Sequence, residues 1–80
     1  MAITAPQMSP EDSALQFKVR LEMRIHPKTE AFAKDLKICV RHSTAILDGE
    51  VSSEIDAKNA ERIALTVPGV AGVVNNIKVS

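Results

Sequence analysis

The side chains best suited to bind a transition metal are His26, Cys39 and His42. Structural zinc sites bring such ligands together at short, repeated spacings, and no pair among these three has such a spacing. The alternating pattern around Cys39 places its thiol on the outer face of a predicted strand, with His42 at the turn that follows. We therefore expect no metal site and interpret all three as surface residues.

Two carboxylates, Asp48 and Glu50, lie two residues apart in a strand-like segment and therefore share one face. Paired carboxylates can serve acid–base catalysis or bind a hard cation. Without a surrounding pocket, however, such a pair is far more often simply solvated. No order of serine, histidine and acidic residues indicates a catalytic triad. We therefore expect no catalytic residue, no cofactor and no enzyme activity.

The amino-acid composition limits the kinds of partner that the chain is expected to bind. The 80-residue chain has 10 Lys and Arg against 10 Asp and Glu, and its only aromatic residues are Phe17 and Phe32. A neutral chain has no global field to attract polyanions, and two aromatic rings offer little for base stacking. Nucleic acid is therefore not an expected partner, and nothing indicates a small-molecule substrate. The single cysteine excludes an internal disulfide.

The second half of the chain has the clearest structural pattern. Residues 45–51 alternate as in a half-buried strand, and Ser53 with Asp56 resembles a helix capping box. A mostly alanine stripe at helical spacing follows, then Pro68-Gly69 as a helix stop and a final alternating run to Val79. A strand, a crossover helix and a second strand predict parallel pairing. Gly49 points inward in this pattern, so its missing side chain would let a helix approach the sheet closely.

The first half of the chain has a less decisive pattern of secondary structure. Residues 1–8 have no periodic pattern and are expected to be a flexible tail, whereas residues 9–80 are expected to form one domain. Ser9-Pro10-Glu11-Asp12 is a typical helix start. Residues 15–25 alternate strictly between apolar and polar, which is typical of a strand. As a helix they would carry two apolar stripes on nearly opposite sides. We favour the helix and keep the strand as an alternative.

The remaining elements complete a small α+β domain. His26-Pro27 ends the first element, and a connector over residues 28–35 contributes Phe32 to the core. A strand over residues 36–41 and a weak turn at His42-Ser43 lead into the next strand. The predicted order is helix, strand, strand, helix, strand, with two helices on one face of a three-stranded mixed sheet. The predicted core, besides Phe32, is Leu15, Val19, Met23, Leu36, Ile38, Val40, Leu47, Val51, Ala60, Ile63, Ala64, Val67, Val73, Ile77 and Val79.

Residues 12–79 resemble a BON domain. The resemblance is carried by an ordered set of short motifs and not by one signature. They are Lys18-Val19, Pro27, the alternating Leu36, Ile38 and Val40, Leu47-x-Gly49-x-Val51, Ala60 with Ile63-Ala64, and Gly69-Val70 followed by Val73, Asn75, Ile77 and Val79. Two features depart from the family pattern: Ser43 stands where the hairpin glycine is expected, and the connector between Pro27 and Leu36 is slightly long.

The resemblance implies a non-enzymatic module that associates with phospholipid membranes or with partner proteins. It also implies a cell-envelope location if the natural chain is longer, whereas a native start at Met1 would favour the cytosol. From the residues themselves, the candidate interaction surface is Phe17, Lys18, Arg20, Leu21, Arg24 and Ile25. Apolar side chains edged by basic ones suit an anionic lipid surface. The alternative is a protein partner, with homo-oligomerisation as one form.

Overall fold

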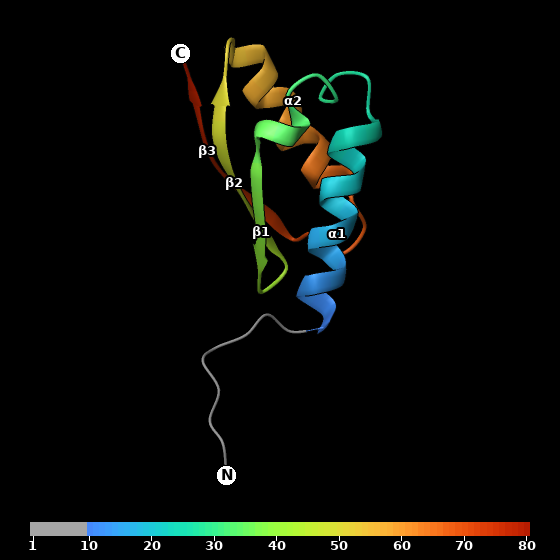
Figure 1. Ribbon diagram of the computed structural model, residues 1–80. Coiled ribbons are helices and arrows are strands. Elements are labelled where there is room, and N and C mark those ends of the chain that lie inside the picture. Colours follow the sequence, from blue (N-terminus) through green and yellow to red (C-terminus); the bar gives the residue numbers. More distant parts are fainter. Residues whose placement is uncertain (1–9) are drawn as a thin grey trace.

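The computed structural model describes residues 10–80, which form an α+β domain with a helix layer on one face of a sheet (Figure 1). The predicted tail and the capping role of Ser9 lie outside the described residues. The elements in chain order are α1 (Pro10–Ile25), the 3-10 helix η1 (Ala33–Asp35), β1 (Lys37–Arg41), β2 (Thr44–Val51), α2 (Glu54–Thr66) and β3 (Gly72–Val79). The predicted order of elements and fold class are confirmed.

The helical interpretation of residues 15–25 is confirmed, and the strand alternative is wrong. Leu15, Val19 and Met23 are buried along one side of α1. These residues are spaced by four, so a helix stacks them on a single face, whereas a strand would have buried every second residue. The helix begins at Pro10, with acidic residues in its first turn where the positive end of the helix dipole lies.

The sheet has the order β1-β2-β3. β1 and β2 pair in antiparallel fashion through the hairpin, and β2 and β3 pair in parallel across the α2 crossover, as predicted. The predicted helix cap is present: the Ser53 hydroxyl accepts the backbone N–H of Asp56 at 3.2 Å. After α2, Gly69 adopts a φ of 99°, which a glycine tolerates without steric cost.

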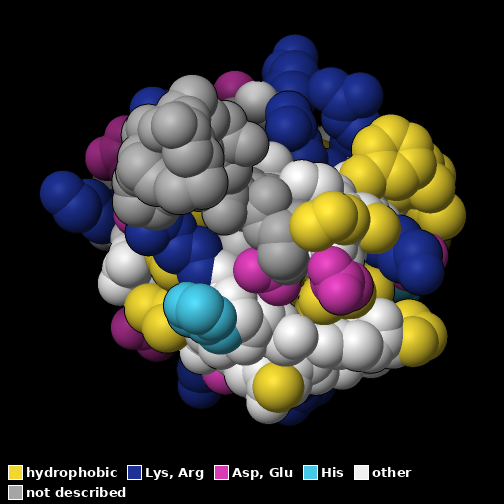
Figure 2. Space-filling model, turned by 90° about the horizontal axis from the view of Figure 1, so that it is seen from below, with side chains coloured by type: hydrophobic (Ala, Val, Ile, Leu, Met, Phe, Trp, Pro, Cys, Tyr) yellow, Lys and Arg dark blue, Asp and Glu magenta, His cyan; other side chains and the backbone are white. Residues whose placement is uncertain are grey.

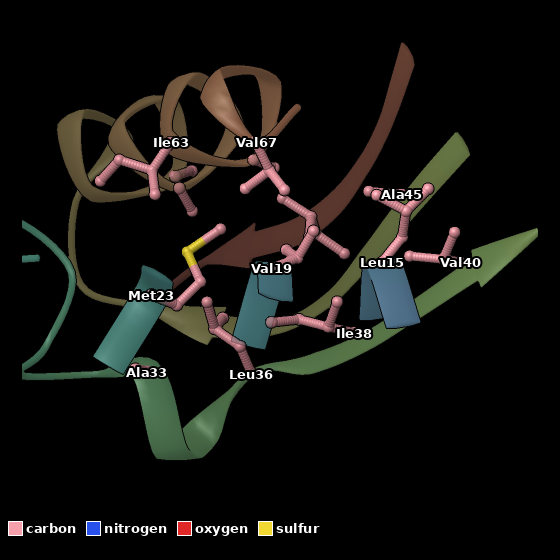
Figure 3. Close-up of a cluster of buried hydrophobic side chains, with 14 of the residues drawn as sticks. Leu15, Val19, Met23, Ala33, Leu36, Ile38, Val40, Ala45, Ile63 and Val67 are labelled. Atoms are coloured by element: carbon pink, nitrogen blue, oxygen red, sulfur yellow. The ribbon is translucent and has the colours of Figure 1, made fainter. Parts of the chain in front are cut away.

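The core lies between the helix layer and the sheet, where side chains from α1, α2 and the first two strands meet (Figure 3). Three alanines, Ala33, Ala45 and Ala57, belong to it besides the predicted residues. The prediction was wrong for Val79, which is 44% exposed, and Phe32, Val73 and Ile77 are only partly buried. The inner face of β3 is less covered by the helix layer than the inner faces of β1 and β2 are.

Gly49 does allow a close approach to the sheet, but the approaching element is not α2. A Cβ at Gly49 would lie 2.9 Å from the carbonyl oxygen of Asp35 and 3.0 Å from Leu36 Cδ2. The backbone there also has a φ of 142°, which side-chain-bearing residues rarely adopt. The glycine therefore accommodates the end of η1 and the residue after it, which the sequence pattern did not indicate.

The connector after α1 is held by a threonine. Thr29 is fully buried, and its hydroxyl donates to the carbonyl of Met23 at 2.6 Å. That carbonyl is in the last turn of α1, where backbone acceptors have no partner within the helix. The bond links the connector after α1 to the last turn of that helix. It thereby helps to position η1 beside α1.

Both edge strands are joined to the helix layer by amide side chains. Gln16 on α1 accepts the backbone N–H of Val40 on β1 at 3.2 Å. Asn75 on β3 donates to the carbonyl of Ala57 on α2 at 3.0 Å, and its oxygen accepts the N–H of Ile77 at 3.0 Å. These contacts link each helix to the strand beside it.

The β1–β2 turn is held by the start of α1. His42 and Ser43 both have positive φ angles, 50° and 62°, as in the type I′ turns that suit two-residue hairpins. Asp12 is buried, and its two carboxylate oxygens accept the backbone N–H groups of His42 and Ser43 at 3.0 and 3.1 Å. This contact supports a turn whose residue types alone are a weak turn signal.

Replacing Ser43 with glycine is therefore expected to stabilise the domain. A left-handed backbone costs a residue with a side chain about 1–2 kcal/mol, and glycine escapes this cost. We expect the free energy of unfolding to rise by about 1 kcal/mol, measured by urea denaturation. The same substitution at Ser52, which has no positive φ, should give no gain. A loss of stability at Ser43 would contradict the turn assignment.

Candidate interaction surface

The outward side of α1 carries a row of apolar side chains, Phe17, Leu21 and Ile25, here called the apolar stripe. They are 67%, 45% and 60% exposed and lie on the side opposite the buried residues of the same helix. Their spacing of four residues makes the row continuous along the helix. Single exposed apolar residues are common, but a continuous row on one element is typical of an interaction site.

A shallow groove of about 350 Å³ runs beside this stripe. It is lined by Ser13, Gln16, Phe17, Arg20, Leu21 and Arg24. The structure thus brings together four of the six residues predicted from sequence as an interaction surface. The other two, Lys18 and Ile25, are exposed on the same helix but lie outside the groove.

A second, smaller hollow lies on the side of α1 that faces β1. Its volume is about 30 Å³, and it is lined by Arg20, Arg24, Ala33, Lys34, Leu36 and Ile38. We call it the cationic hollow, because Arg20, Arg24 and Lys34 are its charged residues. The two arginines line both the groove and the hollow. Lys34 comes from η1 and was not among the predicted residues, because its position depends on how the connector folds back.

The charges around the hollow have one sign. Arg20 and Arg24 are four residues apart on a helix, a spacing at which like charges repel. Within residues 10–80, neither arginine nor Lys34 is seen in a salt bridge. Figure 2 looks at the hairpin end of the molecule, away from η1, and there too Lys and Arg side chains lie next to hydrophobic ones on one part of the rim. The surface therefore combines exposed apolar area with positive charge that is not paired with a carboxylate of residues 10–80.

The residues considered for metal chemistry do not come together. His26 follows the end of α1, where its Nδ1 accepts the N–H of Lys28 at 3.2 Å, and His42 is in the hairpin turn at the other end of the domain (Figure 1). Cys39 is half-buried on β1. Over the described range, no three His, Cys, Asp or Glu side chains form a group that could hold a metal ion.

The two carboxylates on β2 are solvated. Asp48 and Glu50 are both exposed, and their cross-strand neighbours are Lys37 and Lys78. They line a broad, open hollow of about 960 Å³ at one end of the sheet, together with residues of all three strands. Opposite charges placed across neighbouring strands stabilise a sheet. This arrangement favours a structural role for the pair.

Apolar side chains elsewhere on the surface are more dispersed. Ile46 lies opposite Cys39 and Val74 in the strand register, so the three form a short row on the sheet face that the helices leave open. On α2, Ile55 and Leu65 are exposed but ten residues apart. The stripe on α1 differs from both, because all three of its side chains are exposed along one helix and Arg20 and Arg24 lie beside it. Among residues 10–80, no helix is both long and apolar enough to span a bilayer.

The described residues form a small α+β domain, and they hold no cluster of His, Cys, Asp or Glu that could bind a metal ion. The family model for the BON domain matches residues 11–80, and the chain belongs to this family. BON domains are in general non-catalytic binding modules associated with the cell envelope. No curated protein matches the chain.

Proposed function

We propose that this BON domain binds the surface of anionic phospholipid membranes through α1. The observation that carries the proposal is the groove in which exposed Phe17 and Leu21 lie beside Arg20 and Arg24. Apolar side chains gain free energy by entering the region between headgroups and acyl chains, and basic ones gain it from the negative surface potential. One helix face supplies both contributions.

The geometry of the contact supports peripheral association. The stripe lies along the helix on the side away from the core, so the helix can lie parallel to a membrane surface without unfolding any part of the domain. Each basic residue near an anionic surface contributes about 1 kcal/mol, a contribution that salt screens. Binding to a membrane should therefore depend on both lipid charge and ionic strength.

We expect the domain to co-sediment with phosphatidylglycerol vesicles and to be released as the salt concentration rises from 50 to 500 mM. The measurement is the bound fraction in a sedimentation assay, with phosphatidylcholine vesicles as the neutral comparison. Equal binding to both vesicle types at all salt concentrations would remove the electrostatic part of the proposal. No binding to either would overturn it.

A second candidate function is assembly with a protein partner, and the continuous apolar stripe is also the observation that favours it. If Phe17, Leu21 and Ile25 line a homodimer interface, the mass in solution will correspond to a dimer. The substitution Leu21→Glu should then halve that mass in light scattering, because it places a charge in the interface. Ile55→Glu, an equally drastic change at an exposed α2 residue, is the matched control. A wild-type chain that is monomeric at high concentration would exclude the homodimer.

A further inference from the structure

We infer that the cationic hollow binds the phosphate group of an anionic phospholipid, held by Arg20, Arg24 and Lys34. The inference rests on the proposed function for the source of the phosphate. It adds a defined site on one side of α1 and a ligand residue, Lys34, that lies outside this helix.

The charge arrangement supports an anion at this place. Three exposed cationic side chains line one small hollow and are not seen in salt bridges with the described carboxylates. An anion between them would attract all three side chains and so offset their mutual repulsion. Arginine matches the oxygens of a phosphate with two parallel N–H donors, and lysine adds a compact point charge. The cationic hollow thus has both kinds of side chain that bind phosphate, arginine and lysine.

The shape of the hollow limits what enters it. Its volume of about 30 Å³ is close to that of a single water molecule. Buried Leu36 and Ile38 form part of its lining and offer no side-chain hydrogen bonds. A phosphate oxygen fits such a space, whereas the rest of a headgroup must remain outside. The domain therefore holds the phospholipid by its phosphate alone and need not enclose the rest of the headgroup.

The neighbouring groove indicates the kind of molecule that carries the phosphate. Arg20 and Arg24 line the hollow on one side and the groove with Phe17 and Leu21 on the other. A phosphate bound between the arginines therefore has exposed apolar side chains next to it. A phospholipid in a membrane matches both parts of this surface. Its phosphate can bind the arginines, and the acyl chains directly below the phosphate can contact the apolar side chains. A soluble phosphate ester would leave the apolar stripe exposed to water.

The test compares two double variants that each remove one lysine and one arginine. The first variant, Arg24→Gln with Lys34→Gln, removes two charges from the cationic hollow. The second, Lys58→Gln with Arg62→Gln, removes an exposed i, i+4 pair on α2 that lines neither the groove nor the cationic hollow. All four residues are exposed, so both variants should keep the wild-type unfolding curve. The hollow variant should partition onto phosphatidylglycerol vesicles roughly 30-fold more weakly, since each basic residue contributes about 1 kcal/mol and 1.4 kcal/mol is tenfold. The control should change less than threefold.

The possible outcomes distinguish the proposed phosphate site in the cationic hollow from the proposed membrane binding through α1. Equal weakening in both variants would overturn the site and leave membrane binding by general charge attraction in place. If the wild type binds no vesicles, the proposed function fails, and NMR titration with soluble glycerol phosphate decides the site. Shifts at Arg24 and Lys34 that disappear in the hollow variant would keep a phosphate site and overturn its lipid source. No shifts would overturn the site as well.

Discussion

Replacing Gly49 with alanine is expected to lower the free energy of unfolding by about 3 kcal/mol, with contributions from backbone strain and from overpacking. The φ of 142° is unfavourable for any residue with a side chain. The new methyl group would also lie 2.9 Å from the carbonyl oxygen of Asp35, a backbone atom that moves only with η1. A domain of this size is stable by about 4–12 kcal/mol, so the loss is a large part of the total.

Gly72→Ala is the matched control for this prediction. Nothing lies within 4 Å of a Cβ built at Gly72, and its φ is not in the left-handed range. Alanine there should be neutral or slightly stabilising because it restricts the unfolded chain. Urea denaturation of both variants measures the difference. Similar unfolding midpoints for the two would show that the approach of η1 to β2 relaxes at little cost.

Replacing Asp12 with alanine is expected to destabilise the domain by about 2 kcal/mol, since it leaves two backbone N–H groups of the hairpin turn without their charged acceptor. The turn has positive φ at both central residues and depends on this support. Loss of the carboxylate also frees the start of α1 from the β1–β2 hairpin. Amide hydrogen exchange at His42 and Ser43 should accelerate more than exchange in α2.

Glu11→Ala separates this contact from a general effect of charge. Glu11 lies in the same first turn of α1, carries the same charge and is exposed. Both variants lose one favourable interaction with the helix dipole, which contributes about 0.3–1 kcal/mol. The difference between them therefore measures what the Asp12 carboxylate contributes beyond its charge in the first turn, and the hairpin contact is part of that contribution. Equal destabilisation by the two substitutions would mean that the two N–H groups are equally well satisfied by water.

The elements of the fold were predictable because each has a local cause. The alanine stripe of α2, its Ser53 cap and the Pro68-Gly69 stop lie within one stretch of chain, and the structure has all three. Residues 15–25 were harder, because alternation with period two and spacing by four both fit the same apolar positions. The start signal at Ser9-Pro10 and the family resemblance favour the helix, whereas periodicity alone favours a strand.

Contacts between distant parts of the chain were not predictable. Asp12 was interpreted as a first-turn acid, and its bonds to a turn thirty residues away have no counterpart in the sequence pattern. Thr29 occurs in a polar connector yet is fully buried, because its hydroxyl satisfies the end of α1. Val79 alternates as a core residue would, but the helix layer does not reach far enough to cover it.

The candidate interaction surface was predictable on α1 and not beyond it. Helical spacing alone places Phe17 and Leu21 on one side, with Arg20 and Arg24 nearby, and the structure brings these four residues into one groove. Lys34 joins the arginines only because η1 packs against the side of the helix. A single sequence offers no pattern from which that packing could be inferred.

The amide side chains of Gln16 and Asn75 also bear on aggregation. A strand edge offers outward N–H groups on which a further strand can add, and an uncovered edge is a site of fibrillar growth. Gln16 occupies the N–H of Val40 at one edge of this sheet, and Asn75 occupies the N–H of Ile77 at the other. Both bonds block ladder positions that an added strand would need, so this small sheet has a barrier to extension at each side.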